Sequence, residues 1–512
     1  MGLSRILAMK FSKFIDKFLM RPFKDPIKTQ EKFFLKLIRR NQNTIFGKRH
    51  NFSQIYSIKQ FQRNCPIYGY EDYKPYIKLI LEGKPNVLTR AKQVYWGQTP
   101  GTTGTPKLIP IVNHTFKTVN LSIICILISY IMEDPPNNSR FLDGKSCFLA
   151  AYPLLRYEGE LPVGHGTGLF SYYRGGTQIW KLFTKSQLYI PIHLYKIRDI
   201  EQRYYQLVKE IIDKDIRLFS GVPSIVANTL EKILEYAPKL GVNIRKIHDI
   251  FPNYHFNFFG GVSPKFYEKK LEMLIGRRID YREHYSATEG VLGIQLQETP
   301  GFTPMINANF FEFVSVKDPE KRYVINEIKK NKEYYICISA FNGLYAYNLD
   351  DIIKFISVDP PLFVFLARKG VVNLVDEKLS HENILYAINQ TNQEFNTVLT
   401  DFSVIGLRMP NYHYLFILEF PPNSHPTSYS EYLITLDKFL QRTNVIYRFF
   451  RKESGILKAP RMWVLQTGSF SKVLTERVGQ GMSPEQIKIP HLTDDLSIKK
   501  LFEDKVKIEI SL

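Results

Sequence analysis

The sequence has few cysteines and lacks an apolar run long enough to span a membrane. Its 512 residues include only four cysteines, too few and too widely spaced for a disulfide framework or a zinc site. The longest apolar run, Leu121–Met132, is well short of the ~20 residues that cross a bilayer, and we interpret it as a buried helix. Residues 1–30 show no short apolar core followed by a cleavage site. We therefore expect a cytoplasmic protein with no transmembrane segment.

Acidic residues are also in short supply. The chain has 49 Asp and Glu against 69 Lys and Arg, a formal net charge of +20. Half of this excess lies in residues 1–50, where apolar residues recur at helical spacing: Leu7, Phe11, Phe14, Ile15 and Phe18. The pattern favours a solvated basic helix with one buried face, although such a helix can also make peripheral contact with a membrane. No motif supports a nucleic-acid partner.

No segment matches the GxxxxGK[ST] phosphate loop, but residues 99–107, TPGTTGTPK, suit the same ligand. Gly101 and Gly104 let the backbone approach a ligand closely. The threonines supply hydroxyl groups and Lys107 a positive charge, which together suit a polyphosphate. The run lies between two predicted strands, Val94–Trp96 and Leu108–Ile111, so we predict a strand–loop–strand hairpin. Taken alone, the run favours a phosphate ligand, and a polar hairpin turn is the less favoured alternative.

Further polar motifs follow along the chain. Thr288 and Glu289 come after a predicted strand, Asp280–His284, and Glu289 is a hard oxygen ligand suited to Mg²⁺. Gly260–Gly261 end an aromatic strand, where a flat base could lie against bare backbone. Asp351 could accept hydrogen bonds from ribose hydroxyls, and Arg368 could bind ribose or phosphate. Each has an alternative explanation as a turn or a surface charge, but their order argues against independent accidents.

The secondary-structure pattern predicts an α/β fold with two domains. Residues 1–90 have helical periodicity, and short strands then alternate with helices, which is typical of an α/β domain with a substantial sheet. The predicted strands are 146–151, 217–219, 255–259, 311–316, 334–339, 352–356 and 362–366, and the predicted helices include 201–213, 224–236 and 264–274.

A second, smaller α+β unit is predicted from about Lys369 onward. It has a typical domain size. We expect a helix from Ser380, strands over 402–407 and 414–419, one helix over 428–449 and a strand over 462–465.

The order of these motifs resembles the adenylate-forming superfamily, and most closely its GH3 branch of acyl acid–amido synthetases. Segments that match the pattern of this branch extend over nearly the whole chain, from about Thr44 to Pro490: Thr44–Gly47, Pro66–Asp72, Leu81–Leu88, Phe365–Lys369, Glu377–Ser380 and Gln486–Pro490. The resemblance implies a large N-terminal acyl-adenylating domain, residues 1–367, and a smaller mobile C-terminal domain, residues 368–512.

The resemblance also implies an ATP site and its residues. The nucleotide would contact Thr99, Pro100, Gly101, Thr102, Thr103, Lys107, Gly260, Gly261, Tyr285, Ser286, Ala287, Thr288, Glu289, Asp351 and Arg368. Thr288 would touch the α-phosphate, Glu289 would hold Mg²⁺ and Asp351 the ribose. Arg368 would lie at the hinge between the domains. The candidate catalytic residues are Thr288, Lys378 and Lys488, the two lysines reaching the adenylate from the mobile domain.

The implied reaction is ATP- and Mg²⁺-dependent activation of a carboxylic acid, followed by transfer to an amino acid or amine. The products would be an amide, AMP and pyrophosphate, and the expected state is a monomer. Two alternatives remain: an acyl-CoA (thioester) ligase, and a catalytically impaired nucleotide-binding regulator. Departures from the family pattern support the regulator: Pro100 in place of a hydroxyl residue, Ala346 and Asn348 in place of arginines, and Asp350 in place of glycine. Matching residues favour an active enzyme: Glu289, Asp351, Arg368 and Lys488.

Overall fold

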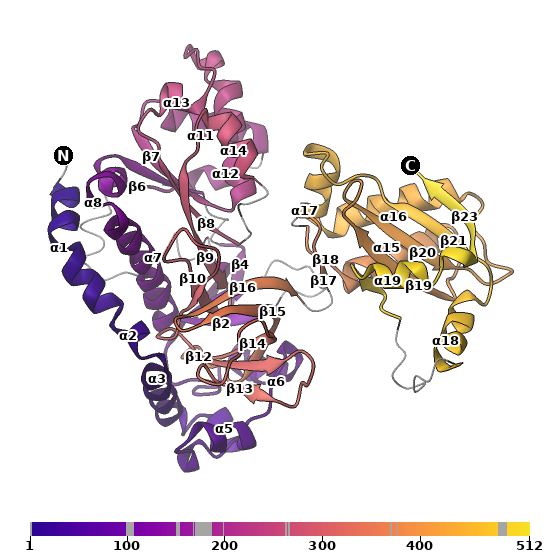
Figure 1. The fold of residues 1–512 in the computed structure, drawn as a ribbon, viewed down its shortest axis with the longest axis horizontal. Coiled ribbons are helices and arrows are strands. Elements are labelled where there is room, and N and C mark those ends of the chain that lie inside the picture. Colours follow the sequence, from indigo (N-terminus) through magenta and orange to yellow (C-terminus); the bar gives the residue numbers. More distant parts are fainter. Residues whose placement is uncertain are drawn as a thin grey trace. The chain divides into compact units, whose positions relative to one another are not determined.

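The computed structural model describes residues 3–98, 107–149, 154–166, 168, 187–197, 199–261, 264, 267–368, 371–375, 377–479 and 489–512. The chain divides into two compact units (Figure 1). The first extends to Leu366, and the second runs from Ala367 to Leu512. We describe each unit by itself.

The first unit begins with helices, as the periodicity of residues 1–90 predicts. They are α1 (Leu3–Leu19), α2 (Arg21–Lys24), α3 (Pro26–Asn41), α4 (Ile45–Arg49), α5 (Ile58–Asn64) and α6 (Tyr70–Leu81). Polar side chains accept hydrogen bonds from the free amides at three of their N-termini: Asp25 for α3, Thr44 for α4 and Ser57 for α5. Such caps fix where a helix starts.

A largely parallel sheet forms the centre of the first unit. Its parallel strands are β3 (Lys145–Phe148), β6 (Leu188–Tyr189), β7 (Ile216–Gly221), β8 (Phe256–Gly260) and β9 (Asp280–Ala287). The order is β11-β10-β9-β8-β7-β3-β6, with β10 (Gly290–Ile294) and β11 (Thr303–Pro304) antiparallel. Because β7, β8 and β9 are parallel, their carboxyl ends meet at one edge of the sheet.

Helices cover both sides of this sheet (Figure 1). The long helix α7 (Asn113–Glu133) packs against β9 and β10, and α12 (Pro223–Tyr236) packs against β7. The other helices of this region are α8 (Pro135–Asn138), α11 (Ile200–Ile211), α13 (Ile247–Ile250) and α14 (Glu268–Ile275). Helix α7 contains the run predicted to be buried. By length and apolar composition it could span a membrane, but more than half of its most apolar window is buried inside the protein, as in the core helix of a soluble domain.

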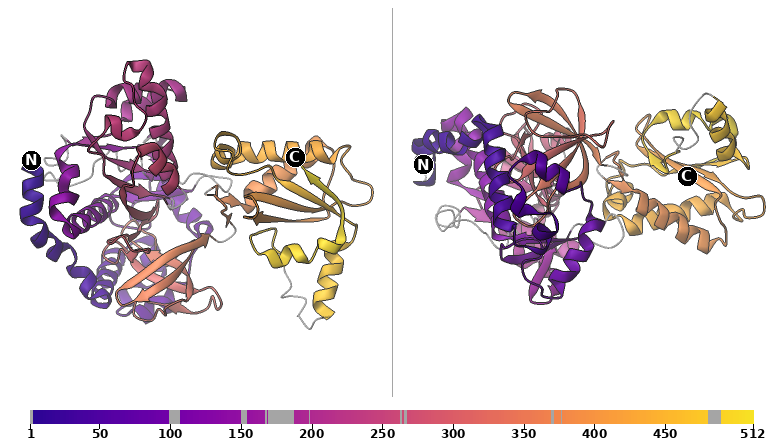
Figure 2. Two further views of the ribbon diagram at one scale, coloured as in Figure 1. Left: turned by 45° about the horizontal axis from the view of Figure 1, so that its top comes forward. Right: turned by 90° about the horizontal axis from the view of Figure 1, so that it is seen from below.

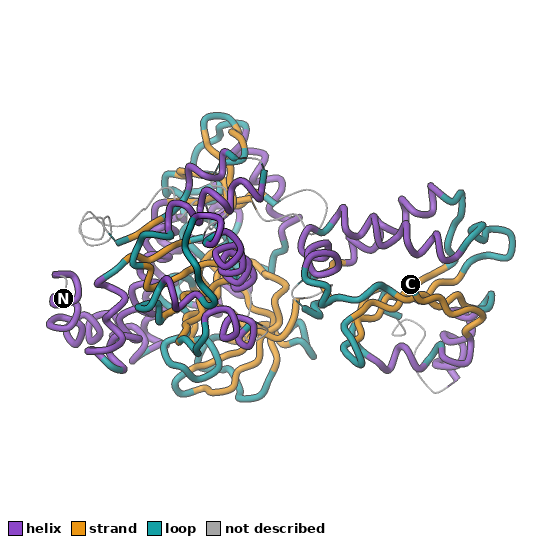
Figure 3. The backbone as a smooth tube through the Cα atoms, turned by 90° about the horizontal axis from the view of Figure 1, so that it is seen from above, coloured by secondary structure: helices purple, strands orange, loops and turns teal. Residues whose placement is uncertain are grey.

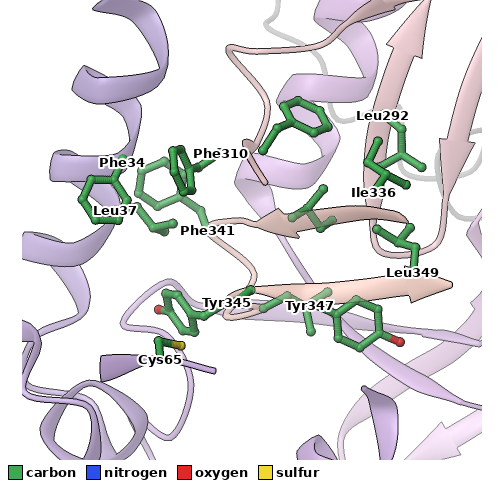
Figure 4. Close-up of a cluster of buried hydrophobic side chains, with 14 of the residues drawn as sticks. Phe34, Leu37, Cys65, Leu292, Phe310, Ile336, Phe341, Tyr345, Tyr347 and Leu349 are labelled. Carbon is green, nitrogen blue, oxygen red and sulfur yellow. The ribbon is translucent and has the colours of Figure 1, made fainter. Parts of the chain in front are cut away.

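Two further sheets complete the first unit. One has the order β2-β1-β5-β4, from β1 (Gln93–Gln98), β2 (Leu108–Val112), β4 (Arg156–Glu158) and β5 (Leu161–His165). The other contains β12 (Phe310–Ser315), β13 (Arg322–Tyr323), β14 (Glu333–Ser339), β15 (Tyr347–Val358) and β16 (Pro361–Arg368). A shared aromatic core joins this second sheet to α3 (Figure 4), where Phe34 of α3 lies 4.9 Å, centroid to centroid, from Phe310 of β12.

The second unit is an α/β sandwich around one sheet with the order β22-β19-β20-β21-β23. It opens with the short strands β17 (Val371–Val372) and β18 (Leu379–Ser380). Figures 2 and 3 show helices on both faces of the sheet. The elements that follow are α15 (His381–Glu394), β19 (Asp401–Leu407), β20 (His413–Glu419), α16 (Tyr429–Thr443), α17 (Val445–Arg448), β21 (Arg461–Leu465), α18 (Ser469–Gly479), β22 (Leu492–Thr493), α19 (Leu496–Lys500) and β23 (Val506–Ser511).

Several predicted elements differ in the structure. The strand predicted over 352–356 is longer, because β15 runs from Tyr347 to Val358, and the helix predicted over 264–274 begins only at Glu268. The strand predicted to end at His284 continues to Ala287 and leads directly into a hairpin. The single helix predicted over 428–449 is interrupted at Asn444, whose backbone is extended (φ −134°, ψ 103°). The Asn444 side chain explains the break, because its oxygen accepts a bond from the Tyr447 amide and its nitrogen donates to the Glu377 carbonyl, 2.8 Å away.

We expect Asn444→Ala to loosen this break locally. The substitution removes a helix cap and leaves the buried Glu377 carbonyl without this donor, at a cost of about 1–2 kcal/mol. Hydrogen exchange of the amides in residues 445–453 should therefore become about tenfold faster. Exchange at the wild-type rate would show that the Asn444 side chain does not maintain the break between α16 and α17.

Candidate active site

The carboxyl edge of the central sheet carries two of the predicted motifs. Gly260 is the last residue of β8 and pairs with His284 of β9, so Gly260–Gly261 and the residues after Ala287 lie on neighbouring strands. Gly261 has a φ of +92°, in the left-handed region that favours glycine. The edge therefore offers bare backbone beside Thr288 and Glu289.

Thr288 and Glu289 form the two-residue turn between β9 and β10, because Ala287 pairs with Gly290. The Glu289 side chain is buried, with 4% of the residue exposed. Its Oε1 accepts a bond of 3.3 Å from the Tyr347 hydroxyl, and its backbone carbonyl accepts one of 3.0 Å from the side-chain nitrogen of Asn342. Among the described residues, the Tyr347 hydroxyl is the donor that bonds this carboxylate. One neutral donor compensates a buried carboxylate poorly, so this position suits a bound cation.

Glu289 has the chemistry of a magnesium ligand rather than of a protein-only metal cage. Within the described parts of the chain, no three His, Cys, Asp or Glu side chains gather where they could hold a metal ion. Mg²⁺ is usually held by one or two carboxylates together with phosphate oxygens and water. A single buried carboxylate at the edge that carries the predicted phosphate contact of Thr288 fits that mode.

Asp351 is placed by a bulge in β15. Between Asn348, which faces Cys337, and Ile352, which faces Tyr335, β15 has more residues than its partner β14. Bulges of this kind redirect side chains and are common next to active sites. Asp350, at the bulge, has a φ of +63°, and Asp351 is buried with 6% exposed.

Tyr285 and Asp351 come from different sheets and meet directly. The Tyr285 hydroxyl donates a 2.6 Å hydrogen bond to Oδ2 of Asp351. The Tyr285 ring is held by three phenylalanines with centroids 5.5–5.9 Å away: Phe302, Phe363 and Phe365. Tyr285, which the resemblance predicts to contact the nucleotide, is therefore adjacent to Asp351, which it predicts to hold the ribose. Ser286 and Ala287 continue β9, opposite Val291 and Gly290 of β10.

The phosphate loop has the predicted strand–loop–strand setting, because β1 and β2 are antiparallel and Gln98 pairs with Leu108. Thr99, Pro100, Gly101, Thr102 and Thr103 lie outside the described residues. Lys107 lies within them, and its Nζ is 5.5 Å from the centroid of the Tyr70 ring.

Thr288 touches the strand that leads into this loop. A Cβ placed on Gly97 of β1 would lie 2.4 Å from the Thr288 Cγ2 atom, far inside van der Waals contact. Only glycine at position 97 allows this approach. The absence of a side chain at Gly97 therefore lets the Thr288–Glu289 turn pack directly against β1, next to its last residue, Gln98.

Tyr70 is a site neighbour that the sequence did not single out. Its hydroxyl accepts a 2.8 Å bond from the Leu108 amide. Burial is the largest cause that raises the pKa of Tyr70, and the negative charge of Glu289 contributes in the same direction. Tyr70 is thus close to both Lys107 and Glu289. Tyr70 belongs to the segment Pro66–Asp72, which matches the family pattern, and this match was the sequence signal that could have identified it.

His284 fixes β9 from behind the site. Ser122 of α7 donates its hydroxyl to the Val119 carbonyl at 2.7 Å, and its oxygen lies 2.8 Å from His284 Nε2. Because the hydroxyl proton of Ser122 is donated to Val119, the Nε2–H group of His284 donates to the Ser122 oxygen. Burial lowers the pKa of His284 to about 4, so the ring stays neutral.

The residues that depart from the expected ribose motif form a turn that is bonded to Tyr68 and closed by bonds between Asn348 and Asp350. Ala346 has a φ of +45°, and its carbonyl accepts a 3.0 Å bond from the Tyr68 amide. The Asp350 amide donates to Asn348 Oδ1 at 2.9 Å, and the Asn348 side-chain nitrogen donates to Asp350 Oδ1 at 3.3 Å. Asp350 thus occupies the left-handed conformation that the usual glycine favours, and one of its carboxylate oxygens is bonded to Asn348.

Three predicted residues fall in the second unit. Lys378 is half-buried and has a φ of +48°. The preceding residue, Glu377, is fully buried; its carboxylate accepts 2.9 Å bonds from the Leu374 and Val375 amides and a further bond from the Tyr414 hydroxyl. The turn that presents Lys378 is therefore tightly anchored. Arg368 ends β16 opposite Val371, and Lys488 lies outside the described residues.

Comparison with known families matches most of the chain. The GH3 family N-terminal domain matches residues 16–250, the GH3 family central domain residues 302–368 and the GH3 family C-terminal domain residues 382–497. Together these matches contain Gly47, Asp351, Arg368 and Lys488 of the motifs above.

Individual relatives extend over nearly the full length. The chain is 22% identical to jasmonoyl–L-amino acid synthetase JAR4 of Nicotiana attenuata, covering 98% of both chains. It is 21% identical to 4-substituted benzoates-glutamate ligase GH3.12 of Arabidopsis thaliana, covering 90% of this chain and 92% of that one. The solved structure of the AtGH3.15 acyl acid amido synthetase in complex with 2,4-DB has the same fold, with a TM-score of 0.59, 18% identity, and coverage of 98% and 97%.

The contact between Gly97 and Thr288 predicts the effect of one added methyl group. Gly97→Ala should displace the Thr288 turn and lower any ATP-dependent turnover by about tenfold or more, since small misplacements at a reacting centre are costly. Gly69→Ala is the matched control, because the nearest atom to its added Cβ is at 3.8 Å. Equal turnover of both variants and the wild type would show that the contact does not matter.

Proposed function

Because the chain belongs to the GH3 family, we propose that it activates a carboxylic acid as an acyl-adenylate and transfers the acyl group to an amino acid or amine. The products are an amide, AMP and pyrophosphate. The relatives are named amido synthetases and ligases, so an acid–amino acid ligase is the enzyme class. The observation that carries the site assignment is the meeting of Tyr285 and Asp351 beside the buried carboxylate of Glu289.

The proposed nucleotide site uses the carboxyl edge of the central sheet. The adenine lies against Gly260–Gly261 with Tyr285 beside it, and the carboxylate of Asp351 accepts the ribose hydroxyls. Thr288, in the turn next to β1, binds the α-phosphate. Lys107 and the threonines of residues 99–103 bind the outer phosphates. The Tyr285–Asp351 bond supports this arrangement because it orients the carboxylate before ribose arrives.

The chemistry requires stabilisation of charge rather than a covalent nucleophile. The carboxylate oxygen of the substrate attacks the α-phosphorus, the bond to the pyrophosphate oxygen breaks, and negative charge gathers on the α-phosphate oxygens. Glu289 would hold Mg²⁺, which when bound neutralises phosphate charge. Thr288 orients the α-phosphate, and Lys378 and Lys488 supply positive charge to the adenylate. The amine then attacks the acyl carbon, and AMP leaves.

Two other functions are weaker candidates. A thioester ligase shares the first step and differs only in the acceptor. A nucleotide-binding regulator is favoured by Pro100 and Asp350. The bonds between Asp350 and Asn348 weaken that second argument, because they hold the extra carboxylate within its own turn. We further propose that the enzyme is cytoplasmic and monomeric.

Removing either site carboxylate should abolish the first half-reaction. We expect Glu289→Ala and Asp351→Ala each to lower acid-dependent pyrophosphate release by about 10²-fold or more, since each removes an electrostatic contact to the nucleotide. Glu298→Ala is the control, because this carboxylate is 67% exposed and pairs only with Arg278 in the described region. Full activity of both site variants would place the nucleotide elsewhere.

The acceptor can be identified by product mass. The protein is incubated with ATP, Mg²⁺ and a panel of acids, together with either amino acids or CoA. An amide product is expected, because the relatives are named as amino acid conjugating enzymes. A thioester with CoA and no amide would select the alternative ligase.

A further inference from the structure

Helix α1 is anchored to the first unit by one face only. Ser12 and Leu19 are buried, and Ala8 and Ile15 pack against the core cluster that includes α7. At the start of the helix, Arg5 forms a 2.6 Å ion pair with Asp143. Figure 1 shows α1 along the outside of α7. The helix is therefore held in a fixed orientation.

The outward side of α1 carries two parallel rows of side chains. One row is aromatic, with Phe11, Phe14 and Phe18 exposed by 51%, 73% and 68%. The sequence pattern placed these three residues on the buried face, and this prediction is wrong because Ile15 and Leu19 face the core instead. The other is basic and shifted by one residue, with Lys10, Lys13 and Lys17 all exposed. Both rows have the spacing i, i+3, i+7, which places their members above one another on a helix. We refer to these six residues as the aromatic–lysine face.

The aromatic–lysine face has no function in the proposed catalysis and needs an occupant. Single exposed apolar residues are ordinary, but aligned phenylalanines with a polar border mark an interaction site. Its surroundings are also basic, because Arg21, Lys24 and Lys28 are exposed in the next two helices. An acidic residue, Asp25, lies among them, and its carboxylate caps α3 by accepting a bond from the backbone amide of Lys28. The occupant must therefore combine an apolar layer with negative charge.

We propose that the aromatic–lysine face docks the enzyme on an anionic phospholipid bilayer. A helix that lies in the bilayer interface buries aromatic side chains at the boundary of headgroups and acyl chains, while neighbouring lysines bind the acidic headgroups. A second copy of the chain fits less well, because face-to-face packing would bring like-charged lysine rows together. A single-stranded nucleic acid needs a basic groove, whereas this face is the convex side of one helix.

The test is co-sedimentation of the full chain with vesicles. Vesicles of phosphatidylcholine alone are compared with vesicles of phosphatidylcholine mixed with phosphatidylserine. We expect binding to the mixed vesicles that weakens as salt is raised. The variants Phe11→Ser/Phe14→Ser/Phe18→Ser and Lys10→Gln/Lys13→Gln/Lys17→Gln should each bind about tenfold more weakly or worse.

Matched controls separate this face from bulk surface properties. Lys317→Gln/Lys330→Gln/Lys332→Gln removes the same charge from three exposed lysines elsewhere, and Met273→Ser removes an apolar side chain that is 70% exposed on α14. Both should bind like the wild type. Circular dichroism checks that all variants are folded, and ATP-dependent turnover should be the same in all of them.

Three results would overturn the proposal. The first is absence of binding to the mixed vesicles. The second is equal binding to both vesicle types that the lysine substitutions leave unchanged. The third is a dimer in sedimentation velocity that the phenylalanine substitutions dissociate without any vesicle binding, which would make the face a contact between copies of the chain.

Discussion

The junction between the central sheet and the β12–β16 sheet determines the geometry of the candidate site. The Tyr285–Asp351 hydrogen bond crosses this junction. Nearby, Phe302 and Phe363 exchange backbone bonds of 2.7 and 3.0 Å. The sheets approach closely because Gly293 of β10 has no side chain: a Cβ there would lie 2.9 Å from the ring of Phe363 of β16. Each sheet alone supplies half of the proposed nucleotide site, and this packing brings the halves together.

The sequence predicted the parts of the site better than their assembly. The Gly260–Gly261 pair, the hairpin around residues 99–107 and the α/β class follow from local patterns, because glycine use and strand periodicity are local properties. The bulge that turns Asp351 toward Tyr285 depends on pairing with β14, and the approach of Thr288 to Gly97 depends on two strands far apart in sequence. Tertiary contacts of this kind leave no local signal, and the break at Asn444 is a further example.

The departures from the family pattern lie at two places, the ribose motif and Pro100. The structure explains those in the ribose motif. Asp350 takes a left-handed conformation within a bulge and is bonded to Asn348, so an aspartate there is compatible with an intact Asp351. The arginines expected at positions 346 and 348 are replaced by a turn that is bonded to Tyr68. The ribose side of the proposed site thus relies on the Tyr285–Asp351 pair. Pro100 lies outside the described residues.

We claim that the residues gathered at this sheet junction form an adenylation site. Exchange of labelled pyrophosphate into ATP reports acyl-adenylate formation alone and needs no acceptor amine or CoA. We predict exchange that depends on at least one acid from a broad panel of aromatic and aliphatic acids, and that requires Mg²⁺. ATP binding without acid-dependent exchange for any acid in the panel would contradict the claim and identify a nucleotide-binding regulator.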